Sequence, residues 1–217
     1  MAKAIVAGAS GLIGGLLVDT LTQSPVYKEV VVLVRKELPI IGNKVKLLVV
    51  DFDRLEDYEK EINGHAIFCC LGSTRSKTPD LNAYRKIDHD YSLQLAQMAA
   101  KNGVEQFHLV SALGANTASG NFYTKMKGET EEDIKKTGVK CIHIYQPSVL
   151  TGDRKEKRVT ERTLIRLMGF INLFLWGGLR KYRSIPAATV AVAMYKQSLT
   201  RREGVFIHLS DEIKEIA

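Results

Sequence analysis

Six apolar runs that are typical of β-strands recur along the first 150 residues, and helical patterns separate most of them. The runs are continuously apolar and do not alternate with polar residues, which indicates strands buried on both faces of a parallel sheet. They span residues 4–7, 29–35, 45–50, 65–71, 106–110 and 139–145. Strand–helix alternation of this kind predicts an α/β fold of the doubly wound type.

Helical patterns fill the connections between these runs. We expect helices at residues 11–21, 53–63, 81–101 and 119–136. Beyond residue 150 a polar, basic stretch precedes helical patterns at 160–176 and 187–199 and a last strand near 205–209, which gives a parallel sheet of six to seven strands. We therefore predict one domain in three parts, namely a core at 1–150, a small lobe at 151–200 and a last strand with a tail at 201–217.

The excess of basic residues is confined to one segment. The chain carries 31 Lys and Arg against 24 Asp and Glu, a net charge of +7. Residues 151–185 contain nine basic and three acidic side chains, which is +6 of that total. A basic balance suggests nucleic acid or membrane partners, but this distribution restricts the question to what residues 151–185 face.

Cysteine and histidine usage argues against disulfide and metal sites. Cys69, Cys70 and Cys141 lie in apolar strand-like runs, where a free thiol behaves as a small buried hydrophobe. The five histidines lack the spacing of metal ligands, so we expect no metal. No segment reads as a signal peptide, and the longest apolar stretch, 167–179, is shorter than the roughly 20 residues that cross a bilayer. A cytoplasmic protein without a transmembrane segment is expected.

A glycine-rich loop lies between the first strand and the first helix. Residues 8–14 read GASGLIG, a GxxGxxG pattern. Glycines let a phosphate approach backbone N–H groups closely, and the N-terminus of the following helix attracts the negative charge. The third glycine allows close packing of helix and strand. The loop is therefore predicted to bind the phosphates of a dinucleotide.

The end of the second strand indicates which dinucleotide binds. An acidic residue at this position bonds the ribose hydroxyls in NAD sites, but this chain has Arg35, followed by Lys36. A guanidinium suits a 2′-phosphate and stacks beside adenine. NADP(H) is therefore favoured over NAD(H), and the alternative is that Arg35 is a solvated strand end.

Tyr123 and Lys127 form a YxxxK pattern. Residues i and i+4 share one face of a helix, so both side chains can point into one pocket. An ammonium beside a phenol favours the phenolate form, which makes a tyrosine usable as acid and base at neutral pH. Ser111 stands twelve residues earlier, after the fifth strand, where open α/β sheets place ligands. Its hydroxyl is suited to bonding a carbonyl oxygen.

With these motifs in order, the chain resembles an atypical short-chain dehydrogenase/reductase of the extended-like NAD(P)-binding Rossmann superfamily. The matching segments are residues 8–14, 70–74 (CLGST), Ser111, Tyr123 with Lys127, and 146–148 (QPS). Within the superfamily, the chain is most similar to the Tat-interactive-protein-like oxidoreductases, which are related to nucleotide-sugar epimerases. The resemblance implies a doubly wound Rossmann fold with a small C-terminal substrate lobe.

The resemblance also implies roles for individual residues. It assigns Asp51 and Phe52 to the adenine, and Pro147 with its neighbours to the nicotinamide. The implied cofactor-binding residues are Gly8, Ser10, Gly11, Leu12, Ile13, Gly14, Arg35, Asp51, Phe52, Leu71, Gly72, Ser73, Lys127, Pro147 and Val149. In catalytic members the Tyr is the acid/base, the Lys binds the nicotinamide ribose and the Ser orients the carbonyl. These roles fall on Tyr123, Lys127 and Ser111.

One position departs from the superfamily pattern. Many members carry an Asn on the helix after the fourth strand, whereas residues 86–89 here read KIDH. A proton relay through that Asn is therefore not expected.

Four interpretations of the basic segment 151–185 remain open. It forms a solvated face over an apolar helix side, or Arg154 holds an anionic substrate or a cofactor phosphate. Alternatively, Phe170, Phe174 and Trp176 form a patch for a membrane surface or a protein partner. Nucleic acid is not expected, because no aromatic residues alternate with the charges and no binding motif is present.

Together these features predict an NADP(H)-dependent oxidoreductase that acts on a small carbonyl or alcohol substrate, which the basic lobe suggests to be anionic. Two alternatives remain: a non-catalytic NADP(H)-binding regulatory protein, and a nucleotide-sugar epimerase- or dehydratase-like enzyme. The superfamily often associates through helices, so a homodimer is compatible with the sequence.

Overall fold

A computed structural model of the chain describes residues 2–39, 42–152 and 176–217. Arg154, Phe170 and Phe174 lie outside the described residues, as do nearly all of the predicted helix at 160–176 and most of the basic segment.

Seven parallel strands form the central sheet, in the order β3-β2-β1-β4-β5-β6-β9. The strands are β1 (Ala2–Ala7), β2 (Tyr27–Val34), β3 (Val45–Val49), β4 (Ala66–Cys69), β5 (Gln106–Val110), β6 (Cys141–Gln146) and β9 (Gly204–Leu209). The order reverses between β1 and β4, so the two halves wind outward in opposite directions. This is the doubly wound Rossmann arrangement, and the predicted fold class is confirmed.

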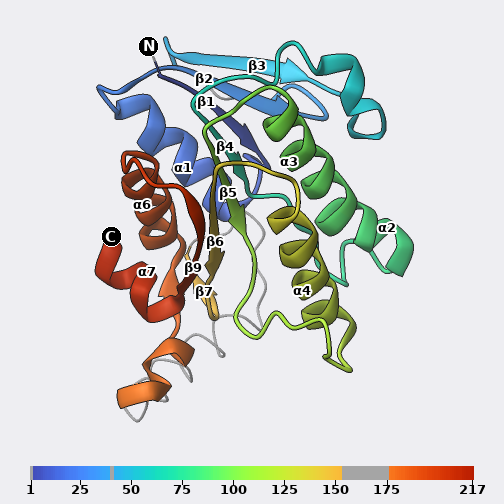
Figure 1. Cartoon of the computed structure of the whole chain (residues 1–217), viewed down its shortest axis with the longest axis vertical. Helices are drawn as coiled ribbons and strands as arrows, with labels where there is room; N and C mark the ends of the chain where they lie inside the picture. Colours follow the sequence, from blue (N-terminus) through green and yellow to red (C-terminus); the bar gives the residue numbers. More distant parts are fainter. Residues whose placement is uncertain (1, 40–41, 153–175) are drawn as a thin grey trace.

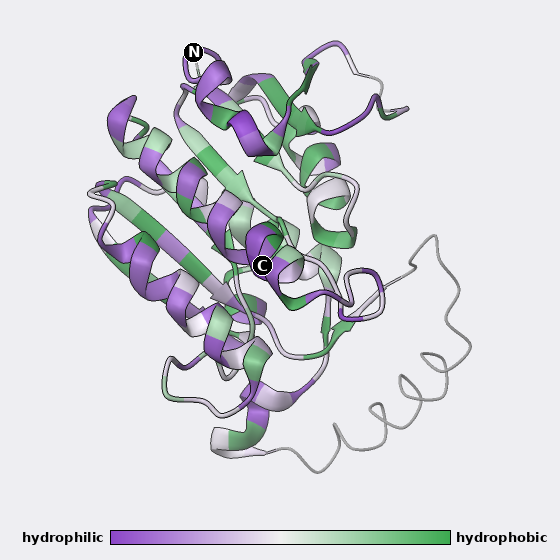
Figure 2. Ribbon diagram, turned by 90° about the vertical axis from the view of Figure 1, so that its right-hand side faces the viewer, coloured by the Kyte–Doolittle hydropathy of each residue, from purple (hydrophilic) through white to green (hydrophobic). Residues whose placement is uncertain are grey.

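Helices cover both faces of the sheet (Figure 1). One face carries α1 (Leu12–Gln23), α6 (Ala187–Ser198) and α7 (Ser210–Ile216), and α1 packs directly against α6. The other face carries α3 (Tyr91–Lys101) and α4 (Phe122–Lys135), with the short α2 (Leu81–Arg85) ahead of α3. Figure 2 shows hydrophobic strands enclosed between helices that carry many hydrophilic residues.

Each face of the sheet has its own hydrophobic core. In β1, Ala4 and Val6 pack on the α1/α6 side, whereas Ile5 and Ala7 pack on the α3/α4 side. Because successive strand residues point to opposite faces, a strand buried on both sides needs an unbroken apolar run. The expectation of two-sided burial therefore holds for the central strands, while the edge strands β3 and β9 are partly exposed.

The segment predicted as a helix over 53–63 differs in the structure. A short 3-10 helix covers Phe52–Tyr58, and Arg54 within it has non-helical backbone angles. The Asp51 side chain accepts from the backbone N–H of Asp53 at 2.9 Å, which starts this tighter turn. Leu55 and Ile62 are buried. The spacing of apolar residues therefore predicted correctly which side of the segment is buried, but it did not predict a 3-10 helix.

The helix predicted over 81–101 is interrupted near its start. Between α2 and α3, residues Lys86–Asp90 form a π-helical turn. The extra residue in this wider turn leaves both Asp88 and His89 buried. Hydrophobic spacing alone does not reveal such an insertion, because the flanking turns keep the ordinary helical period.

Part of the region predicted as a C-terminal lobe is visible. A two-stranded parallel pair, β7 (Leu150–Thr151) with β8 (Ile185–Pro186), lies beyond the end of β6, and a 3-10 helix spans Gly177–Tyr182. Buried residues of α6 belong to the core beside α1. The predicted division of the chain at residues 150 and 200 stays a prediction.

The three cysteines are free thiols, with Cys69 and Cys141 buried and Cys70 half-buried. Burial raises the pKa of the Cys69 and Cys70 thiols, which keeps them protonated. Among the described residues, no helix has the length and apolar character needed to span a bilayer.

The packing of Gly14 generates a testable prediction about the fold. A Cβ at this position would lie 2.3 Å from the carbonyl oxygen of Gly8. Alanine is favoured over glycine within a helix by about 1 kcal/mol, but the contact is with backbone and cannot be relieved by a side-chain rotation. We expect Gly14→Ala to lower the free energy of unfolding in urea by about 1–3 kcal/mol.

The matched control is Gly120→Ala, because a Cβ at Gly120 meets no atom within 4 Å. Its free energy of unfolding should stay equal to that of the parent protein or rise slightly. Equal stability of the Gly14→Ala variant and the parent would contradict the close packing of α1 on the loop.

Candidate functional site

The glycine-rich loop joins β1 to α1 at the point where the strand order reverses. Gly8 has a φ of +88°, a conformation that favours glycine. A Cβ on Gly8 would lie 2.4 Å from the carbonyl oxygen of Cys70, in the loop that follows β4. The loops after β1 and β4 therefore touch, backbone against backbone, at the crevice where open α/β sheets bind ligands.

The N-terminus of α1 is suited to an anion. Gly11 is the N-cap residue, and among the described residues no side chain forms a cap hydrogen bond there. The first backbone N–H groups of a helix have no partner within the helix. The N–H groups of Leu12 and Ile13 are therefore available to a ligand. The exposed backbone at Ser10 and Gly11 allows close approach. These residues fit the pyrophosphate of a dinucleotide.

The residues predicted to meet the adenosine lie at the carboxyl ends of β2 and β3. Arg35 directly follows β2, and its side chain is exposed. Asp51 is also exposed, but its carboxylate already accepts from the N–H of Asp53. Phe52 is buried and packs on Tyr91 with ring centroids 5.3 Å apart. The exposed Arg35 side chain can thus reach a ligand, whereas the buried Phe52 packs beneath the surface predicted to meet the adenosine.

The loop after β4 is held by a buried carboxylate. The backbone N–H of Ser73 donates to Asp88 Oδ2 at 2.7 Å. A Cβ on Gly72 would lie 3.4 Å from Asp88 Oδ1, so the carboxylate packs directly under this loop. Leu71, Gly72 and Ser73, all predicted cofactor residues, are therefore positioned by a side chain from the π turn.

Asp88 also forms a buried ion pair with the lysine of the YxxxK pattern. Lys127 Nζ lies 2.9 Å from Asp88 Oδ1, and the two side chains are only 5% and 1% exposed. Burial lowers the pKa of Lys127, but the charge of Asp88, its hydrogen bond to the lysine and the nearby Tyr123 and Cys69 together outweigh burial and raise the pKa well above its usual value. Lys127 is therefore a permanent cation in this site.

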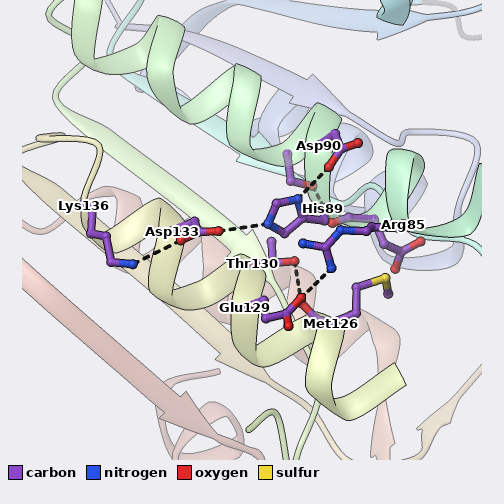
Figure 3. Close-up of polar contacts among 10 residues, drawn as sticks. Arg85, His89, Asp90, Met126, Glu129, Thr130, Asp133 and Lys136 are labelled. Carbon is purple, nitrogen blue, oxygen red and sulfur yellow. Dashed lines mark hydrogen bonds and ion pairs between the residues drawn. The ribbon is translucent and has the colours of Figure 1, made fainter. Parts of the chain in front are cut away.

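Further contacts attach the π turn to α4. Arg85 pairs with Glu129, and His89 Nε2 lies 3.1 Å from Asp133 Oδ2 (Figure 3). His89 also contacts its neighbour Asp90 at 2.7 Å through Nδ1. Glu129 and Asp133 lie about one helical turn apart on α4, so the wide turn that carries Asp88 is held in register with Lys127.

Tyr123 lies one turn before Lys127 on α4 and borders an open cleft. The cleft has a volume of about 410 Å³, and it is lined by Ser73, Thr74, Arg75, Tyr84, Asn121, Phe122 and Tyr123. The ring of Tyr123 stacks on Tyr84 with centroids 6.4 Å apart, and the residue is 37% exposed. The phenol is therefore open to a ligand on one side and backed by an aromatic ring on the other.

Ser111 is placed differently from Tyr123. It directly follows β5 and is buried, and its hydroxyl donates to Glu131 Oε1. The Gln146 side-chain amide donates to both oxygens of Glu131 at 2.9 Å. The structure thus places Ser111 near the carboxyl edge of the sheet but with its proton turned to α4 instead of to the cleft.

The remaining predicted residues follow β6. Pro147 is buried and its carbonyl accepts from Leu113 N–H at 3.0 Å. Val149 is exposed, and its carbonyl accepts from Ile185 N–H at 3.0 Å. The contact to Leu113 ties the end of β6 to the segment that follows β5, beside Ser111.

A separate cavity of about 820 Å³ lies at the opposite, amino-terminal end of the strands, where Lys3, His65 and Leu199 contribute to its walls. It is larger than the cleft at Tyr123. However, ligands of open α/β sheets bind beyond the carboxyl ends of the strands, and none of the predicted site residues that the structure describes lines this cavity. The cleft at Tyr123 is therefore the candidate active site.

Two residues of this site were not assigned from the sequence. Asp88 was recognised only as a departure from an expected Asn, and its position beneath Gly72 follows from the π turn. Glu131 carried a signal that was not used, since Tyr123, Lys127 and Glu131 recur every four residues and so share one face of a helix.

The buried ion pair gives a direct prediction. Asp88→Asn keeps the shape of the side chain but leaves the Lys127 ammonium buried without a counter-charge. We expect the free energy of unfolding at pH 7 to fall by about 3–5 kcal/mol. Chemical denaturation followed by circular dichroism measures this change.

The control uses an ion pair on the surface nearby. Lys86 and Asp53 lie 2.7 Å apart and both side chains are about half exposed, so Asp53→Asn should cost no more than about 1 kcal/mol. Similar losses of unfolding free energy in the two variants would show that burial of the Asp88–Lys127 pair does not account for the destabilisation.

Comparison with known proteins gives the family. A family model described as NAD(P)H-binding matches residues 8–169, which is most of the chain and begins at the first glycine of the loop. Protein HTATIP2 from Rattus norvegicus is 30% identical over 201 residues, which is 91% of this chain and 81% of that protein. A protein named FMP52, mitochondrial, from Saccharomyces cerevisiae is 36% identical over 184 residues, covering 83% and 76% of the two chains.

Solved structures share the fold. MoeE5 in complex with UDP-glucose and NAD matches with a TM-score of 0.72 at 15% identity, over 97% of this chain and 79% of that one. The oxidoreductase ylbE from Lactococcus lactis matches with a TM-score of 0.58 at 25% identity, over 70% and 71% of the two chains. Together with the glycine-rich cradle at the reversal of strand order, these matches show that the chain belongs to the NAD(P)H-binding Rossmann family, with HTATIP2 and FMP52 among its relatives.

Proposed function

We propose that this protein is an NADP(H)-dependent oxidoreductase that acts on a small carbonyl or alcohol in the cleft at Tyr123. The observation that carries the proposal is the arrangement on α4, where an open phenol precedes a buried, permanently charged Lys127 by one helical turn. A bound nicotinamide supplies or accepts the hydride in such a reaction. The chain itself must bind the dinucleotide, hold the reacting oxygen and move one proton.

The proton is the task of Tyr123. Its phenol borders the cleft, so it can give a proton to a carbonyl oxygen during reduction or take one from an alcohol during oxidation. Lys127 places a positive charge one helical turn from Tyr123 on the same helix. Asp88 keeps Lys127 charged and in place, so its role in this proposal is to position the lysine.

The substrate class follows from the walls of the cleft. Tyr84, Phe122 and Tyr123 offer aromatic surface, and the exposed Arg75 offers a cation at the rim. A small carbonyl compound with an apolar body and an anionic group fits these walls. Arg154, proposed from the sequence to bind such a group, lies outside the described residues.

The preference for NADP(H) is also part of the proposal. Arg35 stands at the end of β2, exposed, where NAD sites carry an acidic residue. Its guanidinium can form charge-assisted hydrogen bonds to a 2′-phosphate. The cytoplasmic location and the homodimer stay predictions, and the word mitochondrial belongs to the names of the fungal relatives.

One observation favours a second candidate function, an NADP(H)-binding regulatory protein without turnover. Ser111 gives its only hydroxyl proton to Glu131, and in this arrangement it does not donate to a substrate carbonyl. A protein of this kind would bind the dinucleotide and still show no reduction with any carbonyl. Turnover separates the two candidates.

The first test concerns the cofactor. We expect Arg35→Ser to raise the Kd of NADPH by about 10- to 100-fold, because a hydrogen bond to a charged group contributes about 1.5–3 kcal/mol. The Kd of NADH should stay nearly unchanged. Titration followed by the fluorescence of the reduced nicotinamide measures both constants.

Lys28→Ser is the matched control, because Lys28 is an exposed cation on the same strand near its amino-terminal end. It should leave both constants unchanged. Equal losses for NADPH and NADH in Arg35→Ser, or no NADPH binding by the parent protein, would defeat the cofactor assignment.

The second test concerns catalysis. A panel of small carbonyl compounds, monitored by oxidation of NADPH, should identify a substrate. Tyr123→Phe should then lower kcat by about 10²- to 10⁴-fold, since the proton donor is removed. Tyr195→Phe is the control, because its hydroxyl contacts Ser24 beside α6, away from the cleft. Activity that survives Tyr123→Phe would refute the assignment of the acid/base.

A further inference from the structure

A buried carboxyl group lies behind the serine of the proposed site, and its direct partners among the described residues are all uncharged. Glu131, Ser111 and Gln146 are all buried. Glu131 accepts from the Ser111 hydroxyl through Oε1, and the Gln146 amide donates to Oε1 and Oε2 at 2.9 Å each. A carboxylate with only a hydroxyl and an amide as partners is costly to bury, because no opposite charge compensates for its lost hydration.

The protonation state of Glu131 determines what Ser111 can do. An ionised carboxylate only accepts hydrogen bonds, and a serine hydroxyl has one proton to donate. When Ser111 gives that proton to Glu131, only its lone pairs face any ligand. In this state Ser111 accepts from the hydroxyl of an alcohol, but it has nothing to donate to a carbonyl oxygen.

The protonated form of Glu131 reverses this arrangement. Its O–H can donate to Ser111 Oγ, while the other oxygen still accepts from Gln146. The serine proton is then released from Glu131 and available to a carbonyl oxygen. The hydrogen bond between Ser111 and Glu131 can therefore run in either direction. The two arrangements differ by one proton on Glu131.

We propose that Glu131 is a positioning residue that selects the reacting oxygen through Ser111. When Glu131 is protonated, Ser111 can donate a hydrogen bond to a carbonyl oxygen. When Glu131 is ionised, Ser111 can accept a hydrogen bond from an alcohol hydroxyl. The proposal rests on the proposed function, because it takes Ser111 to be the residue that holds the reacting oxygen. Glu131 neither gains nor loses a proton during turnover, since Tyr123 delivers or accepts the reaction proton and the dinucleotide carries the hydride.

The surroundings of Glu131 bring its titration toward neutral pH. Burial raises its pKa above the ordinary value of 4.5, whereas the hydrogen bonds from Ser111 and Gln146 and the charges of Lys135 and Lys127 oppose the rise. Lys127 is paired with Asp88 from the π turn, which reduces its effect. At the ends of β5 and β6, the groups facing the carboxyl are the neutral Ser111 and Gln146.

Infrared titration of the cofactor-free protein tests the protonation directly. A protonated carboxyl in a dry site has its own C=O stretching band, and we expect such a band to persist above pH 4.5 and to vanish in Glu131→Gln. In Ser111→Ala the band should persist to higher pH than in the parent, because a donor that favours the ionised form is lost. Glu132→Gln, an exposed neighbour on the same helix, should leave the band unchanged.

The pH dependence of turnover tests the consequence. In the parent protein, the rate of carbonyl reduction should fall by about tenfold for each pH unit above the pKa of Glu131, whereas alcohol oxidation should rise with pH below that pKa and level off above it. Glu131→Gln should remove both changes. Glu132→Gln should retain the profile of the parent.

The outcomes separate this proposal from the proposed function. A panel without any substrate would defeat the proposed function, whereas the infrared titration would still decide whether Glu131 holds a proton that Ser111 senses. A carboxyl band confined to pH values below 4.5 would overturn the inference. So would a band that Ser111→Ala leaves unmoved, or a reduction profile that Glu131→Gln leaves unchanged. The infrared comparison of the parent with Ser111→Ala does not depend on the folding of Glu131→Gln.

Discussion

The ion pair between Asp88 and Lys127 joins three segments that are distant in the sequence: the loop after β4, the π turn before α3, and α4. Burying two charges is expensive, and the attraction between them offsets this only when the geometry is good and the remaining hydrogen bonds are satisfied. Asp88 meets this condition by accepting from Ser73 N–H with its other oxygen. The positions of the loop after β4 and of the YxxxK helix are therefore coupled through one carboxylate.

The glycine-rich loop has a corresponding role at the neighbouring strand. Gly8 contacts the backbone at Cys70, and Gly14 contacts the backbone of the loop itself. Side chains at either position would separate α1 from the sheet and the β1 loop from the β4 loop. The crevice thus depends on two close backbone approaches on one side and a buried ion pair on the other, both at the reversal of strand order.

Much of the fold and part of the site could be predicted from the sequence. The continuous apolar runs located β1 to β6 because two-sided burial demands such runs, and the glycine pattern located the tight turn between β1 and α1 because close backbone approach demands missing side chains. The predicted helix over 53–63 was wrong in type because a local cap at Asp51 favours a tighter turn. The π turn was missed because a single inserted residue leaves the periodicity of α2 and α3 intact.

The sequence by itself determined the doubly wound sheet, the glycine-rich turn after β1 and the shared helix face of Tyr123 and Lys127, since each depends on local spacing. Only the tertiary structure decided how these side chains are used. It placed Asp88 against Lys127 and turned the Ser111 hydroxyl to Glu131. These pairings join residues 20 to 39 positions apart, and whether two distant polar groups meet depends on packing between elements, which spacing along the chain does not encode.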